Sequence, residues 1–391
     1  MLLINKEEEN KTEERLQQLI TAGNEENRLK WARDFKARGG KVIGLDGGYI
    51  PEELIHAGGM FPLRLIGTQQ GSVLQATTYL PPNYDRYSAH VLESVLSGEF
   101  DFIDGITISD FADDIRRLGD LLVYLKKPSF IYRLHVPFQD SQLAIQKFYE
   151  NLSSLRWSLE EVGGIRITDK ALSRSIKLFN KMRSLLAKLY ELRHRDVPAV
   201  TGTEAMGIVI AAMVMPKDQY VRDLEALMPY LEQRKAEFDL VRARLLVTSD
   251  RLYSRAYLDL IEKTGALVVM DDMDTGIRYF SKKVDTKTNP VYALAHRYLT
   301  KMPETRMPSW DQQVDRIIEW VKEFRIDGVI NFPQDFDFSR LMAGPYFDSR
   351  LNKAGIPHTT LVRDYYPSYM ASLKTRIEAF VEIIEVERPE K

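Results

Sequence analysis

Acidic side chains follow most of the short apolar runs that resemble strands. In open parallel sheets, ligands bind at the edge where the carboxyl ends of the strands meet. Carboxylates gathered there could carry protons or bind a cation. Aspartate also suits turns and helix N-caps, and for any single residue that role is the more frequent one. The acids in question are Asp46, Asp110, Asp250, Asp271, Asp272, Asp335, Asp337 and Asp364.

Asp271 and Asp272 are adjacent and directly follow the apolar run 266–270. Two neighbouring carboxylates can cap a helix, pair with a base such as Arg278, or coordinate a cation. All three roles stay open from the sequence.

The segment from Tyr49 to Gly59 contains Pro51, Glu52 and Glu53. Proline at the first position, acids in the first turn and glycine at the end describe a short helix. One carboxylate could instead face a cleft as a proton carrier. The helix alone explains the spacing.

The segment from Tyr79 to His90 combines Pro81-Pro82 with three tyrosines, Asp85, Arg86 and His90. The prolines impose an extended backbone, and the tyrosines supply apolar walls with hydroxyl tips. Tyr84, Tyr87 and His90 could therefore line a substrate pocket, or the segment could be a well-packed connection. A lone histidine is more often a satisfied core or surface residue than a ligand.

The chain has 391 residues and no cysteine. Disulfides, zinc-thiolate sites, catalytic thiols and cysteine-ligated iron–sulfur clusters are therefore excluded within this chain. Its formal net charge of −2 disfavours a nucleic-acid partner. Gly-rich phosphate loops are missing as well, which disfavours nucleotide motors and dinucleotide dehydrogenases.

The first residues lack the apolar core of a signal peptide, so we expect a cytoplasmic protein. The longest apolar run, 205–216, falls short of the roughly 20 residues of a membrane span. We expect a buried core helix there and no membrane partner.

The alternation of strand-like and helical segments predicts an α/β protein. We expect two Rossmann- or flavodoxin-like units with mostly parallel sheets, joined by a helical segment and preceded by an N-terminal helix. The predicted parts are 1–37 (N-terminal helix), 38–142 (first unit), 143–240 (helical connection) and 241–391 (second unit with a C-terminal helix). The predicted strands are 41–45, 61–66, 102–108, 129–135, 243–248, 266–270, 327–332 and 358–362.

Several runs resemble the 2-hydroxyacyl-CoA dehydratase and benzoyl-CoA reductase family, particularly its smaller, β-type subunits. The resemblance extends over about residues 37–385. Its most specific parts are the block P-E-E-L-x-x-A-x-G-M-x-P, starting at Pro51, and K-T-R-x-x-A-F, starting at Lys374. The runs are 42–67, 91–118, 266–280 and 326–384.

The resemblance implies a heterodimer of two similar subunits. Each subunit of the family has two α/β units that clasp a four-iron four-sulfur cluster held by three cysteines. An ATP-hydrolysing activator injects one electron, and the acyl-CoA thioester becomes a ketyl radical that expels its leaving group. Benzoyl-CoA reductases apply related electron chemistry to an aromatic ring.

This chain departs from the family at the cluster ligands. The positions that the family fills with cysteines correspond here to Asp85, Ala112 and Asp337. Alanine offers no ligand atom, so we expect no ordinary cluster in this chain.

Three hypotheses follow from the resemblance and the missing cysteines. The favoured one is a cluster-free subunit that supports a homologous, cysteine-containing partner and its ATP-dependent activator. The second is a repurposed acyl-CoA enzyme in which Asp85 and Asp337 bind a divalent metal as a Lewis acid. The third is a non-catalytic acyl-CoA-binding or scaffold protein. If the chain is part of an enzyme, we expect an acyl-CoA lyase (dehydratase) or reductase.

The resemblance also assigns roles to other residues. Glu53 occupies the family's P-x-E-L position and is the candidate for proton transfer or substrate orientation. Lys374 and Arg376 could meet CoA phosphates, although a solvated helix face is the more frequent role for such residues. The remaining candidate substrate contacts are Tyr84, Tyr87, His90, Asp271, Asp272 and Arg278.

Overall fold

The computed structural model describes residues 2–69, 71–126, 129–236, 238, 241–307 and 309–387. The side chains of residues 2–9 lie outside that description. Within it, two four-stranded sheets form, and every strand pair is parallel. The predicted α/β class is confirmed, and all eight predicted strands are present, most of them with shifted ends.

The first sheet has the strand order β2-β1-β3-β4. Its central strands are apolar and fully buried, as strands covered on both faces must be. The strands are β1 (Val42–Asp46), β2 (Phe61–Arg64), β3 (Gly105–Ser109) and β4 (Ile131–Leu134). The connections carry α3 (Glu52–Ala57), a 3-10 turn (Ala76–Thr78), α4 (Arg86–Leu96) and α5 (Asp113–Lys126).

The second sheet repeats this order as β6-β5-β7-β8. The two units therefore share one topology, with the first and third strands of each unit at the centre of its sheet, although their sequences show no repeat. The strands are β5 (Ala243–Thr248), β6 (Ala266–Asp272), β7 (Gly328–Asn331) and β8 (His358–Thr360). The helices are α10 (Ala256–Glu262), α11 (Ile277–Phe280), α12 (Pro290–Thr300), α13 (Trp310–Glu323), α14 (Phe338–Lys353) and α15 (Met370–Glu387).

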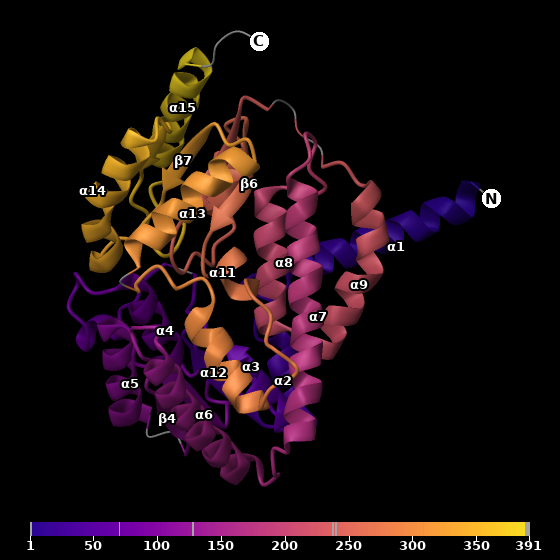
Figure 1. The fold of residues 1–391 in the computed structure, drawn as a ribbon, viewed down its shortest axis with the longest axis vertical. Helices are drawn as coiled ribbons and strands as arrows, with labels where there is room; N and C mark the ends of the chain where they lie inside the picture. Colours follow the sequence, from indigo (N-terminus) through magenta and orange to yellow (C-terminus); the bar gives the residue numbers. More distant parts are fainter. Residues whose placement is uncertain are drawn as a thin grey trace.

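Helices join the two units (Figure 1). The apolar run predicted as a core helix is α8, which contacts β2 of the first sheet and β6 of the second. Since both of its sides face a sheet, α8 is apolar nearly all round, and eleven of its residues are buried. The connecting helices are α6 (Gln142–Gly163), α7 (Asp169–Arg193), α8 (Gly202–Val214) and α9 (Lys217–Gln233).

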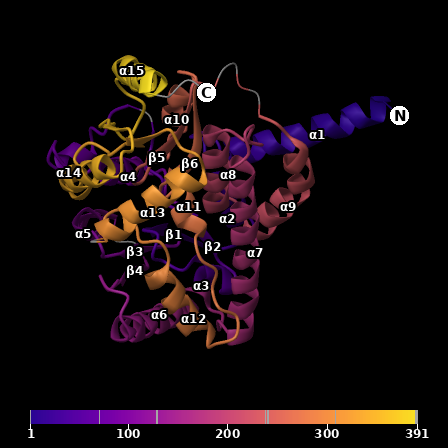
Figure 2. The same cartoon turned by 45° about the horizontal axis from the view of Figure 1, so that its top comes forward.

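The predicted N-terminal helical segment consists of two helices. α1 covers Leu2–Thr21, and a turn separates it from α2 (Lys30–Ala37). Both views show α1 projecting outward, with the N-terminus at its far end (Figures 1 and 2). Leu16, Leu19 and Ile20 are buried, and α1 packs on α8.

The chain crosses between the units a second time. After β6 the backbone runs back, and α12 packs against α6 beside the first sheet. The segment after α12 then returns to the second unit through residues 301–307, which lie between the two units. Among the helices of the described residues, none has the length and apolar character needed to cross a membrane.

Candidate functional site

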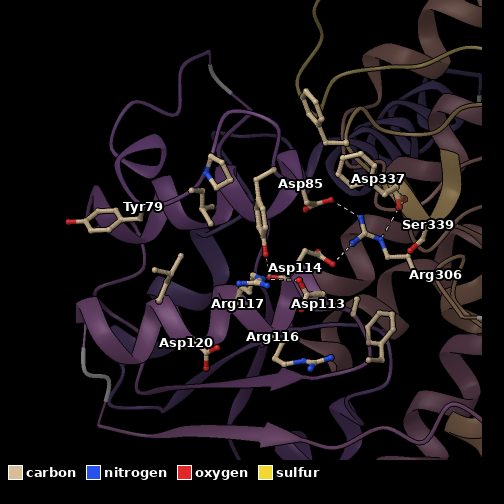
Figure 3. A pocket seen from close by; sticks show the side chains of 18 of the residues that line it. Tyr79, Asp85, Asp113, Asp114, Arg116, Arg117, Asp120, Arg306, Asp337 and Ser339 are labelled. Atoms are coloured by element: carbon tan, nitrogen blue, oxygen red, sulfur yellow. Dashed lines mark hydrogen bonds and ion pairs between the residues drawn. The ribbon is translucent and has the colours of Figure 1, made fainter. Parts of the chain in front are cut away.

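A cleft of about 840 Å³ opens between the two units. This volume lies within the range of ligand pockets. We call it the interunit cleft and define it by the elements that line it: the 79–85 loop, the start of α5, Phe138, Arg306 and the start of α14. Six aromatic and eight charged side chains belong to its lining, and Figure 3 labels the charged ones. The aromatic lining comprises Tyr79, Tyr84, Phe111, Phe138, Phe336 and Phe338.

The three positions predicted to correspond to family cysteines all line this cleft. Asp85 comes from the N-terminus of α4, Ala112 from the loop after β3, and Asp337 from the N-terminus of α14. Asp337 is far from the other two in the sequence, yet all three line the same cleft. Two of the three are carboxylates, and both also cap a helix: Asp85 accepts from the Ser88 N–H, and Asp337 from the Arg340 N–H.

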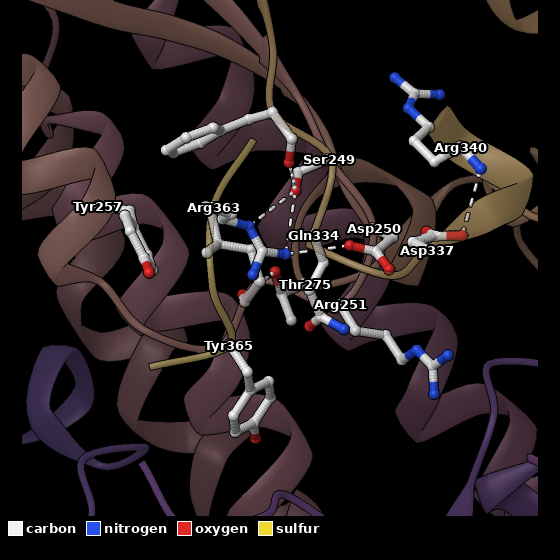
Figure 4. Close-up of polar contacts among 12 residues, drawn as sticks. Ser249, Asp250, Arg251, Tyr257, Thr275, Gln334, Asp337, Arg340, Arg363 and Tyr365 are labelled. Atoms are coloured by element: carbon white, nitrogen blue, oxygen red, sulfur yellow. Dashed lines mark hydrogen bonds and ion pairs between the residues drawn. The ribbon is translucent and has the colours of Figure 1, made fainter. Parts of the chain in front are cut away.

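Arg306 lies between these carboxylates. Its Nη2 is 2.7 Å from Asp85 Oδ2 and 3.3 Å from Asp250 Oδ2, and its Nη1 is 2.5 Å from Asp114 Oδ1. Its Nε is 3.5 Å from Asp337 Oδ2. The Arg306 side chain is 7% exposed. We call Arg306 with Asp85, Asp114, Asp250 and Asp337 the Arg306 cage; Figure 3 shows it without Asp250, which Figure 4 shows.

Two further arginines, Arg251 and Arg363, form ion pairs with carboxylates of the cage. Arg251 Nη2 is 2.7 Å from Asp114 Oδ2, and the Arg251 guanidinium lies over the ring of Tyr87 at 4.1 Å. Arg363 donates to Asp250 Oδ1 at 3.0 Å and to the Ser249 hydroxyl at 3.2 Å (Figure 4). Four carboxylates are thus matched by three guanidinium groups.

The cage contains one carboxyl that titrates near neutrality. Burial, together with the neighbouring Asp250 carboxylate, raises the pKa of Asp337 to about 7 against the attraction of Arg306. Burial also opposes ionisation of Asp250 and Asp114. At Asp250 the positive charges of Arg363 and Arg306 outweigh the effect of burial, and the pKa lies well below its usual range. At Asp114 the charges of Arg306 and Arg251 lower the pKa in the same way. With one proton on Asp337, the four carboxyl groups carry three negative charges, which the guanidinium groups of Arg306, Arg251 and Arg363 balance.

Neither a cluster nor a divalent metal fits this arrangement. The chain has no thiolate, and Ala112 offers no ligand atom. The Asp85 and Asp337 oxygens that could bind a metal point at the Arg306 guanidinium. Across the part of the chain that the structure describes, no group of three or more His, Asp or Glu side chains is placed to hold a metal ion.

Asp271, Asp272 and Arg278 lie outside the interunit cleft, in buried ion pairs. Asp272 is 2.7 Å from Arg278 and accepts from the Thr248 hydroxyl at 2.9 Å. Asp271 is 2.7 Å from Arg193, a partner that the sequence pattern did not indicate. Of the three roles open to the Asp271-Asp272 pair, the structure shows pairing with bases.

Glu53 is fully buried and does not line the interunit cleft. Its carboxylate is ion-paired at 2.5 Å with Arg183, from α7, and accepts from the Tyr298 hydroxyl at 2.7 Å. Burial favours the neutral form of Glu53, but Arg183 and Arg297 outweigh it and lower the pKa. Acid–base use near neutral pH needs a carboxylate without a basic partner, and Glu53 does not meet that condition.

Of the tyrosine-rich segment, Tyr84 and Asp85 line the cleft, whereas Tyr87 and His90 do not. The Tyr87 hydroxyl donates to Asp46 Oδ1 at 2.8 Å and to the Leu65 carbonyl at 2.7 Å. His90 Nδ1 is 2.7 Å from the Thr68 carbonyl oxygen, and burial lowers the His90 pKa. Tyr87 and His90 are thus satisfied core residues.

Lys374 and Arg376 lie on α15 and do not line the cleft. Lys374 is 3.5 Å from Glu378 on the same helix, and Arg376 donates to the Thr360 carbonyl at 3.2 Å. Their assignment to CoA phosphates remains a prediction.

Other strand-end acids stabilise turns. Asp335 accepts from the N–H of the next residue at 3.0 Å, and Asp364 does the same at 2.7 Å. Asp110 accepts from the Val136 N–H at 3.0 Å and contacts His135. Of the strand-end acids, only Asp250 and Asp337 belong to the cage.

Sequence reasoning missed Arg306, Asp114 and Arg251. Asp114 and Arg251 each stood close to a noticed position, since Asp114 is two residues after Ala112 and Arg251 follows Asp250. Arg306 lies in the loop between α12 and α13, where no motif marks it.

Charged side chains fill the space behind the cage. Lys217 is 2.7 Å from Glu52, and Arg64 is 3.4 Å from the same residue. The two small cavities in this region measure about 20 Å³ and about 10 Å³. A cavity of that size holds roughly a water molecule. Neither of these two cavities therefore has room for an acyl chain.

The chain is similar in sequence to several known proteins. The family model described as "2-hydroxyglutaryl-CoA dehydratase, D-component" matches residues 48–384. The (R)-phenyllactyl-CoA dehydratase beta subunit of Clostridium sporogenes is 24% identical, over 90% of this chain and 94% of the relative. A subunit of the benzoyl-CoA reductase of Thauera aromatica is 26% identical, over 88% and 91%. The beta subunit of the (R)-2-hydroxyglutaryl-CoA dehydratase of Acidaminococcus fermentans is 26% identical, over 89% and 93%.

Proposed function

The chain belongs to the 2-hydroxyglutaryl-CoA dehydratase D-component family, and on this premise we propose that it is the cluster-free subunit of a heteromeric acyl-CoA dehydratase or reductase. Its partner is a homologous subunit that carries the cysteines and the four-iron four-sulfur cluster. Each of the three relatives is named as one subunit of such an enzyme, and the match spans nearly their full lengths. Electron supply by an ATP-dependent activator then concerns the partner subunit.

One observation carries this proposal. Asp85, Ala112 and Asp337 meet at one cleft between the units, and the Arg306 guanidinium is ion-paired there with Asp85 and Asp337. A chain that keeps the cleft but has no cluster ligand in it needs its redox chemistry elsewhere. The filled interior behind the cage supports the same conclusion, because the cavities found there among the described residues are too small for an acyl group.

In this proposal the residues of this chain support the catalytic partner structurally. The ion pairs of Glu53 with Arg183 and of Asp271 with Arg193 link α7 to both units. The interunit cleft, with six aromatic side chains and Arg116 and Arg117 among its lining, remains open. It offers a surface for the CoA portion of a thioester whose acyl end reacts in the partner.

The test is anaerobic purification of the tagged chain after co-expression with each cysteine-containing homologue of its source organism. We expect one homologue to co-elute in equal amount, iron to be found only in that homologue after separation, and acyl-CoA turnover to need both chains. Turnover of an acyl-CoA by the chain alone would contradict the proposal. Acyl-CoA binding by the chain alone, with neither partner nor turnover, would favour the scaffold hypothesis instead.

A further inference from the structure

We infer that Arg306 is a built-in substitute for the missing cluster: its guanidinium cation takes the central place among the former ligand positions and ties the two α/β units together. This inference rests on the family correspondence of Asp85, Ala112 and Asp337. It does not depend on the identity of a partner, so it would stand even if the proposed heteromer failed its test.

The cage draws its members from both units. Asp85 caps α4 and Asp114 lies in α5, both in the first unit, whereas Asp250 and Asp337 follow β5 and β7 of the second. Arg306 contacts all four carboxylates, with a different nitrogen facing Asp114, Asp337 and the pair Asp85–Asp250. The planar guanidinium fork suits several carboxylates at once, which a single ammonium does not.

The guanidinium and a cysteine-bound cluster share the same arrangement of charge, with a positive centre among anionic groups. A cysteine-bound cluster is an iron-bearing core surrounded by anionic ligands. In this chain a cation is again surrounded by anionic side chains from both units, but the cation is covalently part of the protein. Gln334 completes the ring by donating to Asp85 Oδ2 at 3.2 Å. The connection therefore needs neither iron nor exclusion of oxygen.

Removing the cation should turn the cage into a cation site. Without Arg306, four buried carboxylates would face one vacated space, with Arg251 and Arg363 left to balance them. Breaking a buried pair from one side strongly destabilises a protein, because the remaining charge is left uncompensated. Carboxylate oxygens are the preferred ligands of Ca²⁺, and a free guanidinium ion matches the group that was removed.

The experiment compares melting temperatures of the full-length wild type, Arg306→Ala and Arg350→Ala after treatment with a chelator. Arg350 is the matched control, because it pairs with Asp311 and Asp315 at the surface, where all partners are partly exposed. We expect Arg306→Ala to melt roughly 10 °C below the wild type and Arg350→Ala to stay close to it.

Millimolar CaCl2 or methylguanidinium chloride is then added to each protein. We expect either salt to raise the melting temperature of Arg306→Ala, whereas equimolar NaCl does not, and neither to raise that of the wild type or Arg350→Ala. Equal shifts in the wild type would overturn the inference, because the cage would then have room for an outside cation. A melting temperature of Arg306→Ala equal to that of the wild type would overturn it as well.

Arg306→Lys serves if Arg306→Ala does not fold. An ammonium keeps the charge but cannot contact carboxylates of both units in the same way. We expect Arg306→Lys to fold and to melt several degrees below the wild type, with protease cleavage appearing first in residues 80–85 or 333–338, where the units meet. Melting and cleavage identical to the wild type would contradict the inference.

Discussion

The surroundings of Glu53 favour a structural role, whereas the resemblance predicted proton transfer or substrate orientation. Its carboxylate lies between Arg183 and the Tyr298 hydroxyl, both from outside the first sheet. Since the basic neighbours lower its pKa, Glu53 stays ionised at neutral pH. An ionised, ion-paired glutamate is a poor proton donor, so we expect its main contribution in this chain to be stability.

Glu53→Gln should therefore destabilise the fold. The substitution leaves Arg183 buried without its counter-charge, which we expect to cost about 3 kcal/mol of unfolding free energy. Urea denaturation measures this loss. Glu225→Gln is the matched control, because Glu225 pairs with Lys181 at 2.6 Å while both are about half exposed; it should cost less than about 1 kcal/mol. Equal losses in the two variants would show that Glu53 does not stabilise through its pair.

The sequence predicted some members of the Arg306 cage but not its central arginine. The resemblance indicated Asp85, Ala112 and Asp337, and the structure brings all three to one cleft. Arg306 has no such signal, because it is not in a strand-end position and its partners lie up to 221 residues away. Tyr87 and His90 stood in a motif rich in polar groups, but the fold turns them inward to backbone carbonyls.

At the scale of elements, strands were predictable because each is a short β-branched or apolar run bounded by turn residues. The crossing of α12 onto α6 was not, because helical periodicity says which face is apolar but not which surface will cover it. The dual contact of α8 with both sheets has the same cause. The apolar sequence of α8 predicted that it is buried, but not that β2 and β6 are the strands that cover it.

The packing of α8 on α1 depends on Gly207. A Cβ at this position would lie 2.4 Å from the Ile20 carbonyl oxygen and 3.0 Å from the Ile20 Cα, both of which are backbone atoms. Gly207→Ala should therefore push α1 away and lower the melting temperature, although alanine is the better helix former.

Gly119→Ala is the control for this prediction. Gly119 is also within a helix, α5, and a Cβ there would lie 3.4 Å from the Ile108 Cδ1, which is an ordinary van der Waals distance. We expect this variant to gain roughly 0.5–1 kcal/mol of stability from helix propensity. Thermal melts of the two variants should therefore shift in opposite directions, and a stabilising Gly207→Ala would show that α1 does not pack closely there.

The whole molecule is held together by an interior rich in charge, and this has a consequence for its response to pH. Burial raises the pKa of Asp46 to about 6 and the pKa values of Asp274 and Asp337 to about 7. The folded state therefore holds protons on these groups that the unfolded chain releases near pH 4. Asp114 and Asp250 are shifted the other way, because arginines outweigh their burial. They stabilise the fold above pH 4 and lose that effect as the pH falls.

Stability should consequently decline from about pH 4, the unfolded value, towards pH 8. Below the unfolded value of 3.8 the raised groups contribute fully, and their contribution is lost as the pH rises through their folded values of about 6 to 7. Each proton that only the folded state holds costs about 1.4 kcal/mol per pH unit. Burial lowers the pKa of Lys301 to about 8, and this acts in the opposite sense, but only above that pH.

Asp337→Asn tests this pH dependence, because it removes one titrating group and keeps a neutral side chain of the same shape inside the cage. Urea unfolding of the wild type between pH 5 and pH 8 should show falling stability, and the decline should be shallower in Asp337→Asn by about 1.4 kcal/mol per pH unit where Asp337 is protonated only in the fold. Asp315→Asn is the control, because Asp315 is an exposed acid that pairs with Arg350, a group that does not titrate between pH 5 and pH 8. It should leave the decline nearly unchanged. Stability that is constant or rises from pH 5 to pH 8 would show that the buried carboxyls are ionised throughout, and that the arginines of the cage outweigh burial at Asp337 as they do at Asp250.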